Sequence, residues 1–123
     1  MSNKALSCYL IGETGLTIKC SEILLEKDWK ILGIISEDTV IQNWARQNHI
    51  PTCSSIDRVR ENLQKIEFDY LFNIASPAIL PSWLLNQPKQ LAINYHNAPL
   101  PSYAGTHATS WAILNNEKQH GIT

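Results

Sequence analysis

The sequence predicts a single α/β domain: a doubly wound, mostly parallel open sheet with helices on both faces. Two observations support this prediction. Short apolar runs alternate with segments of helical spacing along the 123 residues, in the order β-α-β-α-α-β-α-β-α. Such alternation favours parallel strands joined by right-handed helical crossovers. The apolar runs are also nearly continuous, as expected of strands that helices cover on both sides.

The N-terminal segment contains a predicted strand and a predicted helix. Residues Leu6–Ile11 form a short apolar run, which indicates a buried strand, and the glycine-bounded turn Gly12–Gly15 closes it. The helix that follows ends near Asp28. Four side chains recur along this helix at i, i+4, i+7 and i+8 and predict one buried stripe: Leu16, Cys20, Ile23 and Leu24.

A second strand and helix follow. Residues Lys30–Ser36 are almost continuously apolar, which predicts a strand buried on both faces. Asp38 is suited to cap the next helix, because a carboxylate at the N-cap accepts hydrogen bonds from the first free backbone N–H groups. The segment His49–Pro51 ends that helix. Its predicted inner face consists of Val40, Ile41, Trp44 and Ala45.

A third helix is predicted to open at Ser54, with Asp57 three residues later in the capping pattern. Its apolar positions keep helical spacing: Ile56, Val59, Leu63 and Ile66. The segment Phe68–Ala75 then predicts another strand.

The C-terminal part contains a short helix, a strand and a last helix. Pro77 and Pro81 bracket a loop and a short helix, because proline favours loops and first helical positions. Residues Leu91–His96 predict a strand, and Thr109–Asn115 predict a helix.

Composition excludes several classes of protein. The chain has 10 Lys and Arg against 11 Asp and Glu, a net charge of −1, which offers no general attraction for nucleic acid or anionic membranes. No apolar stretch is long enough to span a bilayer and none is typical of a signal peptide, so we expect a cytoplasmic protein. The three cysteines form no C-x-x-C pair. Cys8, Cys20 and Cys53 fall in a predicted strand, helix and short loop, and we expect buried thiols and no metal site.

Ligands of open parallel sheets bind beyond the carboxyl ends of the strands. Three loops lie there: Gly12–Gly15, Ala75–Leu80 and His96–Gly105. The first invites a mononucleotide-binding hypothesis, but it lacks G-x-G-x-x-G and G-K-[ST], and Glu13 places a carboxylate where a phosphate would bind. A structural turn that helps to hold part of a substrate is the alternative.

Asn94 and His96 are two residues apart at the end of a predicted strand, so their side chains point to the same side of the sheet. An amide donor and an imidazole at one spot suit a reaction that passes through an oxyanion. Asn can donate to the oxyanion, while His can stabilise it or transfer protons. The alternative is a histidine that only makes a hydrogen bond at a strand end.

A longer pattern begins at the same asparagine. It runs through Asn94-x-His96, Leu100-Pro101-x-Tyr103-x-Gly105, Trp111-Ala112-Ile113, Asn115, Glu117 and Gly121-Ile122-Thr123. This pattern resembles the signature of the folate-dependent formyltransferases. That family includes methionyl-tRNA formyltransferase, glycinamide ribonucleotide transformylase, sugar N-formyltransferases and the formylating domains of nonribosomal peptide synthetases. The resemblance covers the layout of the whole chain and is densest after Asn94.

The resemblance implies a Rossmann-like formyltransferase fold and a reaction in which 10-formyltetrahydrofolate donates a formyl group to an amine. It assigns the catalytic roles to Asn94 and His96. The folate pterin ring is assigned to Pro77, Ala78, Ile79, Leu80 and Ala92. Supporting or substrate contacts are assigned to His107, Gly12 and Glu13. The implied partners are a small-molecule folate and an acceptor amine, with no direct nucleic-acid or membrane contact.

Departures from the signature narrow the comparison. The usual Ser-Leu pair is replaced by Ala98-Pro99, the Arg before Gly105 by Ala104, and a later Pro by Ala108. These changes are most similar to formyltransferase-type domains that begin peptide synthetases, which implies an aminoacyl group on a carrier protein as a candidate acceptor. A methionyl-tRNA or sugar N-formyltransferase fragment is an alternative, and so is a degenerate module with a docking role.

The family also uses an Asp in a D-x-G context beyond the His. After His96 the only carboxylate before Thr123 is Glu117, which matches a non-catalytic position. We therefore expect residues 1–123 to be a formyltransferase-like N-terminal domain that is truncated after residue 123, and expect this fragment to be inactive by itself.

Overall fold

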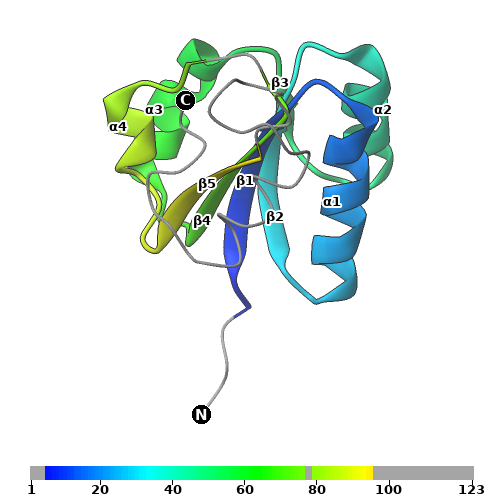
Figure 1. The fold of residues 1–123 in the computed structure, drawn as a ribbon, viewed down its shortest axis with the longest axis horizontal. Coiled ribbons are helices and arrows are strands. Elements are labelled where there is room, and N and C mark those ends of the chain that lie inside the picture. The colour runs from blue at the N-terminus through cyan, green and yellow to red at the C-terminus, as the bar shows by residue number, and fades with distance from the viewer. Residues whose placement is uncertain (1–4, 77–78, 96–123) are drawn as a thin grey trace, which may run out of the picture.

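The computed structural model describes residues 5–76 and 79–95. Strands and helices alternate strictly along this part of the chain, as Figure 1 shows. Their bounds are β1 Ser7–Gly12, α1 Gly15–Glu26, β2 Lys30–Ile35, α2 Thr39–Gln47, β3 Thr52–Cys53, α3 Ile56–Lys65, β4 Tyr70–Ile74, α4 Ser82–Leu85 and β5 Leu91–Tyr95. The helix predicted at 109–115 lies outside the described residues.

The strands form one five-stranded sheet in the order β3-β2-β1-β4-β5, and every neighbouring pair is parallel. The chain moves outward from β1 to β2 and β3, and then returns to the other side of β1 for β4 and β5. The predicted doubly wound open sheet is therefore confirmed, with its change of direction between β1 and β4. This is the point at which such sheets leave a crevice for ligands.

Helices α1 and α2 cover one face of the sheet, and α3 and α4 cover the other (Figure 1). Alternation along β1 supplies both cores: Cys8 and Leu10 pack with Ile41 and Ala45 of α2. Tyr9 and Ile11 face the opposite way, in the cluster that contains Leu63 of α3 and Leu84 of α4. Near-continuous apolar strands were predicted for this reason.

The predicted apolar stripe of α1 is wrong in part. Leu16 and Ile23 are 38% and 43% exposed, whereas the buried residues of α1 are Thr17 and Ser21. Small side chains at the contact let the helix lie close to β1, and the Ser21 hydroxyl donates to Thr17 O at 2.7 Å. Cys20 and Leu24, the other predicted positions, pack partly against the core.

The predicted caps and inner faces are mostly confirmed. Asp38 caps α2 by accepting from the Ile41 backbone N–H at 3.0 Å. Val40, however, is 64% exposed, because it lies off the side of the helix that buries Ile41. The cap of α3 is Ser55 rather than Ser54, since the Ser55 hydroxyl accepts from the Arg58 N–H at 3.2 Å.

Strand β3 was predicted only as a loop. It has two residues, too few to show a hydrophobic period, and its pairing with β2 defines it: Ile34 with Thr52 and Ile35 with Cys53. No helix within 5–76 and 79–95 is long and apolar enough to cross a membrane.

Candidate functional site

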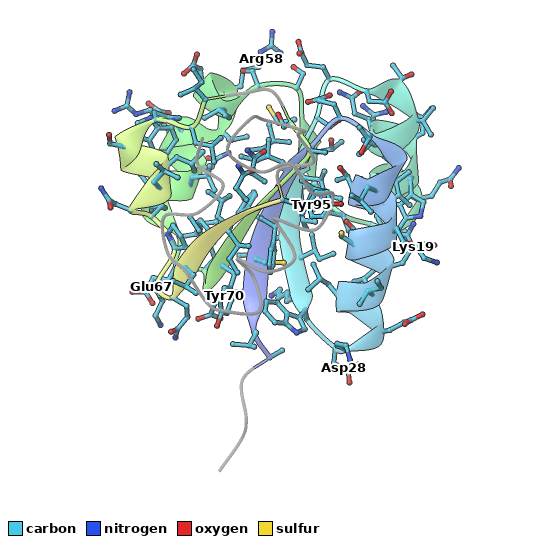
Figure 2. All side chains as sticks on the ribbon, viewed as in Figure 1. Lys19, Asp28, Arg58, Glu67, Tyr70 and Tyr95 are labelled. Carbon is cyan, nitrogen blue, oxygen red and sulfur yellow. The ribbon has the colours of Figure 1, made fainter. Side chains whose placement is uncertain are left out.

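The carboxyl ends of all five strands meet along one edge of the sheet, because the strands are parallel. From this edge β1 continues into α1 on one face, while β4 leads to α4 on the other. In Figure 2, Tyr70 marks the start of β4 and Tyr95 the end of β5, so the edge of interest is the one at Tyr95. The connections diverge there and leave room for a ligand.

Asn94 lies at this edge, one residue before the end of β5, and is 9% exposed. Its register partner on β4 is Asn73. Alternation along β5 places Asn94 on the same face as Ala92, which packs against the α3–α4 core. Its predicted partner His96 lies outside the described residues, so the structure places the amide of the pair but not the imidazole.

Asn73 is a polar residue in this region that the sequence analysis did not single out. It is 3% exposed, and its side-chain oxygen Oδ1 has no hydrogen-bond partner in the part of the chain that the structure describes. It pairs with Ile11 of β1 on one side and with Asn94 of β5 on the other. The available signal was its position two residues after Leu71, which puts a polar side chain on a buried face.

The connection after β4 begins with a strained backbone. Ala75 has φ 51°, in the left-handed region that non-glycine residues adopt rarely. Its N–H donates to Tyr95 O at 2.8 Å, which ties this turn to the end of β5. Such conformations are concentrated at functional sites, where the surrounding structure maintains them.

The residues predicted to hold the pterin ring are only partly placed. Leu80 and Ala92 pack partly against the α3–α4 core, on the face that carries Asn94. Ile79 is 91% exposed and does not join them. Pro77 and Ala78 lie outside the described residues, as does His107, which was predicted to support the site.

Gly12 and Glu13 follow β1 at the same edge. A Cβ on Gly12 would collide with Thr17 Oγ1 and would lie 2.9 Å from Ile74 O, so this position requires glycine for packing. The Glu13 carboxylate accepts from Ser36 Oγ at 3.1 Å and from the Glu37 N–H at 2.9 Å. Glu13 thus takes up donors at the end of β2 that an anionic ligand would otherwise need.

A cavity of about 200 Å³ lies beside these groups. It is lined by the ends of β1 and β2, the start of α3 and the turn after β4: Ile11, Glu13, Ile35, Glu37, Ser54, Ser55, Ile56 and Ser76. The two carboxylates in this lining favour neutral or cationic groups over phosphates.

The cysteines do not contribute a nucleophile to the edge. Cys8 is fully buried in β1, and this burial raises the pKa of its thiol to about 12. Burial also raises the pKa of Cys20 on α1. Both thiols therefore stay protonated near neutral pH. Among residues 5–76 and 79–95, no group of three His, Cys, Asp or Glu side chains could hold a metal ion.

Comparison with known proteins adds independent evidence to this geometry. The methionyl-tRNA formyltransferase of Clostridioides difficile is 26% identical over 129 aligned positions, covering 92% of this chain and 42% of that protein. The Alkaliphilus oremlandii protein of the same name shows the same identity and coverage. That of Clostridium novyi is 41% identical over 63 residues, or 51% of this chain and 20% of that protein.

The chain spans about two fifths of the length of the first two relatives. The family profile described as formyl transferase matches residues 25–123, which include four strands of the sheet and the Asn94 region. A match over this much of the chain, together with the parallel sheet and a buried asparagine at its carboxyl edge, shows that the chain belongs to the formyl transferase family.

Proposed function

We propose that this chain is the catalytic N-terminal domain of an enzyme that transfers the formyl group of 10-formyltetrahydrofolate to an amine. The observation that carries the proposal is Asn94: a buried amide at the carboxyl end of β5, within the N-x-H pattern of a chain that belongs to this family. The folate is a substrate here, consumed as the formyl donor. Leu80 and Ala92 supply apolar surface for its ring beside Asn94.

In the proposed reaction the neutral amine nitrogen attacks the formyl carbon and forms a C–N bond, while the carbonyl electron pair moves onto oxygen. The Asn94 side-chain N–H donates to this oxyanion, and His96 assists as the second group of the pattern. When the oxyanion collapses, the bond from carbon to the folate nitrogen breaks. That nitrogen leaves with the electron pair and takes up a proton, while the attacking nitrogen loses one.

The acceptor is proposed from charge and from the departures in the signature. Glu13 and Glu37 line the cavity at this edge, and the chain carries a net charge of −1, which disfavours an acceptor rich in phosphate. We therefore place an aminoacyl group on a carrier protein first. The second candidate is methionyl-tRNA, which the names of the similar proteins favour.

The test is formyl transfer by the full-length protein, with Asn94→Ala and His96→Ala compared with wild type. Loss of an oxyanion donor is expected to lower kcat by about 10²- to 10³-fold. Asn43→Ala is the matched control, since Asn43 is exposed on α2 and should leave kcat unchanged. Unfolding curves for each variant separate loss of activity from loss of fold.

Two acceptors, an aminoacyl carrier protein and methionyl-tRNA, are compared at equal concentration. Higher kcat/KM for the carrier-bound amine supports the first acceptor, and higher kcat/KM for the tRNA replaces it with the second. A folded wild-type protein that transfers no formyl group and binds no tetrahydrofolate would instead support the degenerate docking module. Calorimetry with ATP and GTP tests the mononucleotide alternative in the same preparation.

A further inference from the structure

The structure contains a buried hydrogen-bond acceptor next to the proposed catalytic amide. Asn73 is 3% exposed, and its Oδ1 makes no hydrogen bond among the residues that the structure describes. An acceptor that is removed from water without a new partner costs folding free energy. A ligand that supplies a donor at this atom would recover that cost.

Register defines the position of Asn73. It lies on β4 between Ile11 of β1 and Asn94 of β5, level with both. Because β1 and β4 flank the point where the sheet changes direction, Asn73 lies where the crevice opens. In-register side chains on neighbouring strands project to the same face, so Asn73 and Asn94 present two amides side by side.

The surroundings of Asn73 are apolar and uncharged. Leu71 precedes it on the same face of β4, and Ala92 is the register partner of Leu71 on β5. Leu80 packs partly against the same cluster, and Leu84 of α4 is fully buried in it. A charged ammonium group would be costly to bury there, since none of these neighbours carries a compensating charge. A neutral N–H on the edge of a planar ring has no such cost.

We propose that Asn73 Oδ1 accepts a hydrogen bond from an N–H group of the pteridine ring of the formyl donor. This inference rests on the proposed function. Leu80 and Ala92 offer apolar contacts to the ring, while Asn73 fixes its rotation by binding one edge. Asn73 is thus a specificity-determining residue for the donor, distinct from Asn94, which acts on the formyl oxygen.

The test uses the full-length protein and tetrahydrofolate as the probe, with affinity measured by calorimetry. Asn73→Leu keeps the size of the side chain and removes the acceptor. We expect it to weaken tetrahydrofolate binding about tenfold, as for a lost hydrogen bond to a buried group. The ligand-free variant is expected to unfold at the same temperature as wild type or higher, because an unpaired polar atom is gone.

Thr52→Val is the matched control. Thr52 Oγ1 is also buried without a partner, but it lies on β3, at the far edge of the sheet from β5. Its replacement removes the same kind of unpaired atom, and it should leave the affinity for tetrahydrofolate within twofold of wild type. Asn73→Ala removes the acceptor with less bulk and should reproduce the affinity loss if Asn73→Leu does not fold.

Three results would overturn the inference while leaving the proposed function standing. One is wild-type affinity in both folded Asn73 variants. A second is a loss of stability with unchanged affinity, which indicates a structural role only. The third is a higher KM for the amine with unchanged affinity for tetrahydrofolate, which assigns Asn73 to the acceptor. Failure of the wild-type protein to bind tetrahydrofolate would overturn the proposed function itself.

Discussion

Glu13 Oε1 accepts a hydrogen bond from Ser36 Oγ at 3.1 Å and so joins the loop after β1 to the end of β2. Ser36 is fully buried, and its Oγ in turn accepts from the Asp38 N–H at 3.1 Å. The same Glu13 oxygen accepts from the Glu37 N–H at 2.9 Å. A carboxylate of the protein therefore organises this corner of the edge, and an incoming phosphate would have to displace it.

Glu13→Ala should destabilise the protein by about 1 kcal/mol, because it leaves the Ser36 hydroxyl and the Glu37 N–H without their acceptor. Glu13→Gln keeps an acceptor oxygen and should cost less. Urea unfolding measures both, with Glu22→Ala, an exposed change on α1, as the control. Equal stability of Glu13→Ala and Glu22→Ala would show that these hydrogen bonds contribute nothing.

Gly12→Ala should destabilise the fold by about 1–3 kcal/mol, the usual cost of overpacking. Its new Cβ would collide with Thr17 Oγ1 and would lie 2.9 Å from the carbonyl oxygen of Ile74, a backbone atom that cannot turn away. Gly15→Ala is the matched control, because a Cβ there meets nothing within 4 Å. Thermal unfolding compares the two, and a Gly12→Ala protein as stable as Gly15→Ala would contradict this account of the turn.

Val40 and Ile41 are adjacent apolar residues of α2 with opposite environments, at 64% and 1% exposed. Ile41→Ala removes buried methyl groups from the α1–α2 core and should cost about 2–4 kcal/mol. Val40→Ala should change the free energy of unfolding by less than about 0.5 kcal/mol. Denaturant titration of both variants measures the difference. Similar losses in the two would mean that α2 is rotated from the position described here.

Most of the architecture could be predicted from the sequence, because β1, β2, β4 and β5 each coincide with an apolar run. Periodicity failed where packing does not follow hydrophobicity. Helix α1 buries Thr17 and Ser21 because small side chains fit closely against β1, while Leu16 stays partly exposed. Strand β3 exists through its pairing with β2, a long-range contact that two residues cannot reveal.

The candidate site divides in the same way. Asn94 was predicted from its spacing to His96 and its place at a strand end, and β5 does end at Tyr95. Asn73 has no motif of its own. It becomes a candidate only when the register places it beside Asn94 and the buried oxygen is found without a partner. Local spacing therefore indicates one residue of a site, whereas tertiary pairing identifies its neighbours.

Thiol reactivity tests the described core at a group that the proposed chemistry does not use. Burial is the main reason that the pKa of Cys8 is raised to about 12 from 9.0, and the nearby charge of Asp69 adds to it. At pH 8 the folded protein should therefore react with a thiol reagent at Cys8 only as fast as it unfolds. Cys53, which is half-buried on β3, should react first.

The same shift predicts how stability depends on pH. Above pH 9.0 the unfolded chain loses the Cys8 proton while the folded protein retains it until about pH 12. The free energy of unfolding should therefore fall as pH rises through this window, by at most about 1.4 kcal/mol per pH unit from this group. Cys8→Ala should make that fall shallower. An unchanged slope, or native Cys8 labelled as fast as Cys53, would contradict the burial of this thiol.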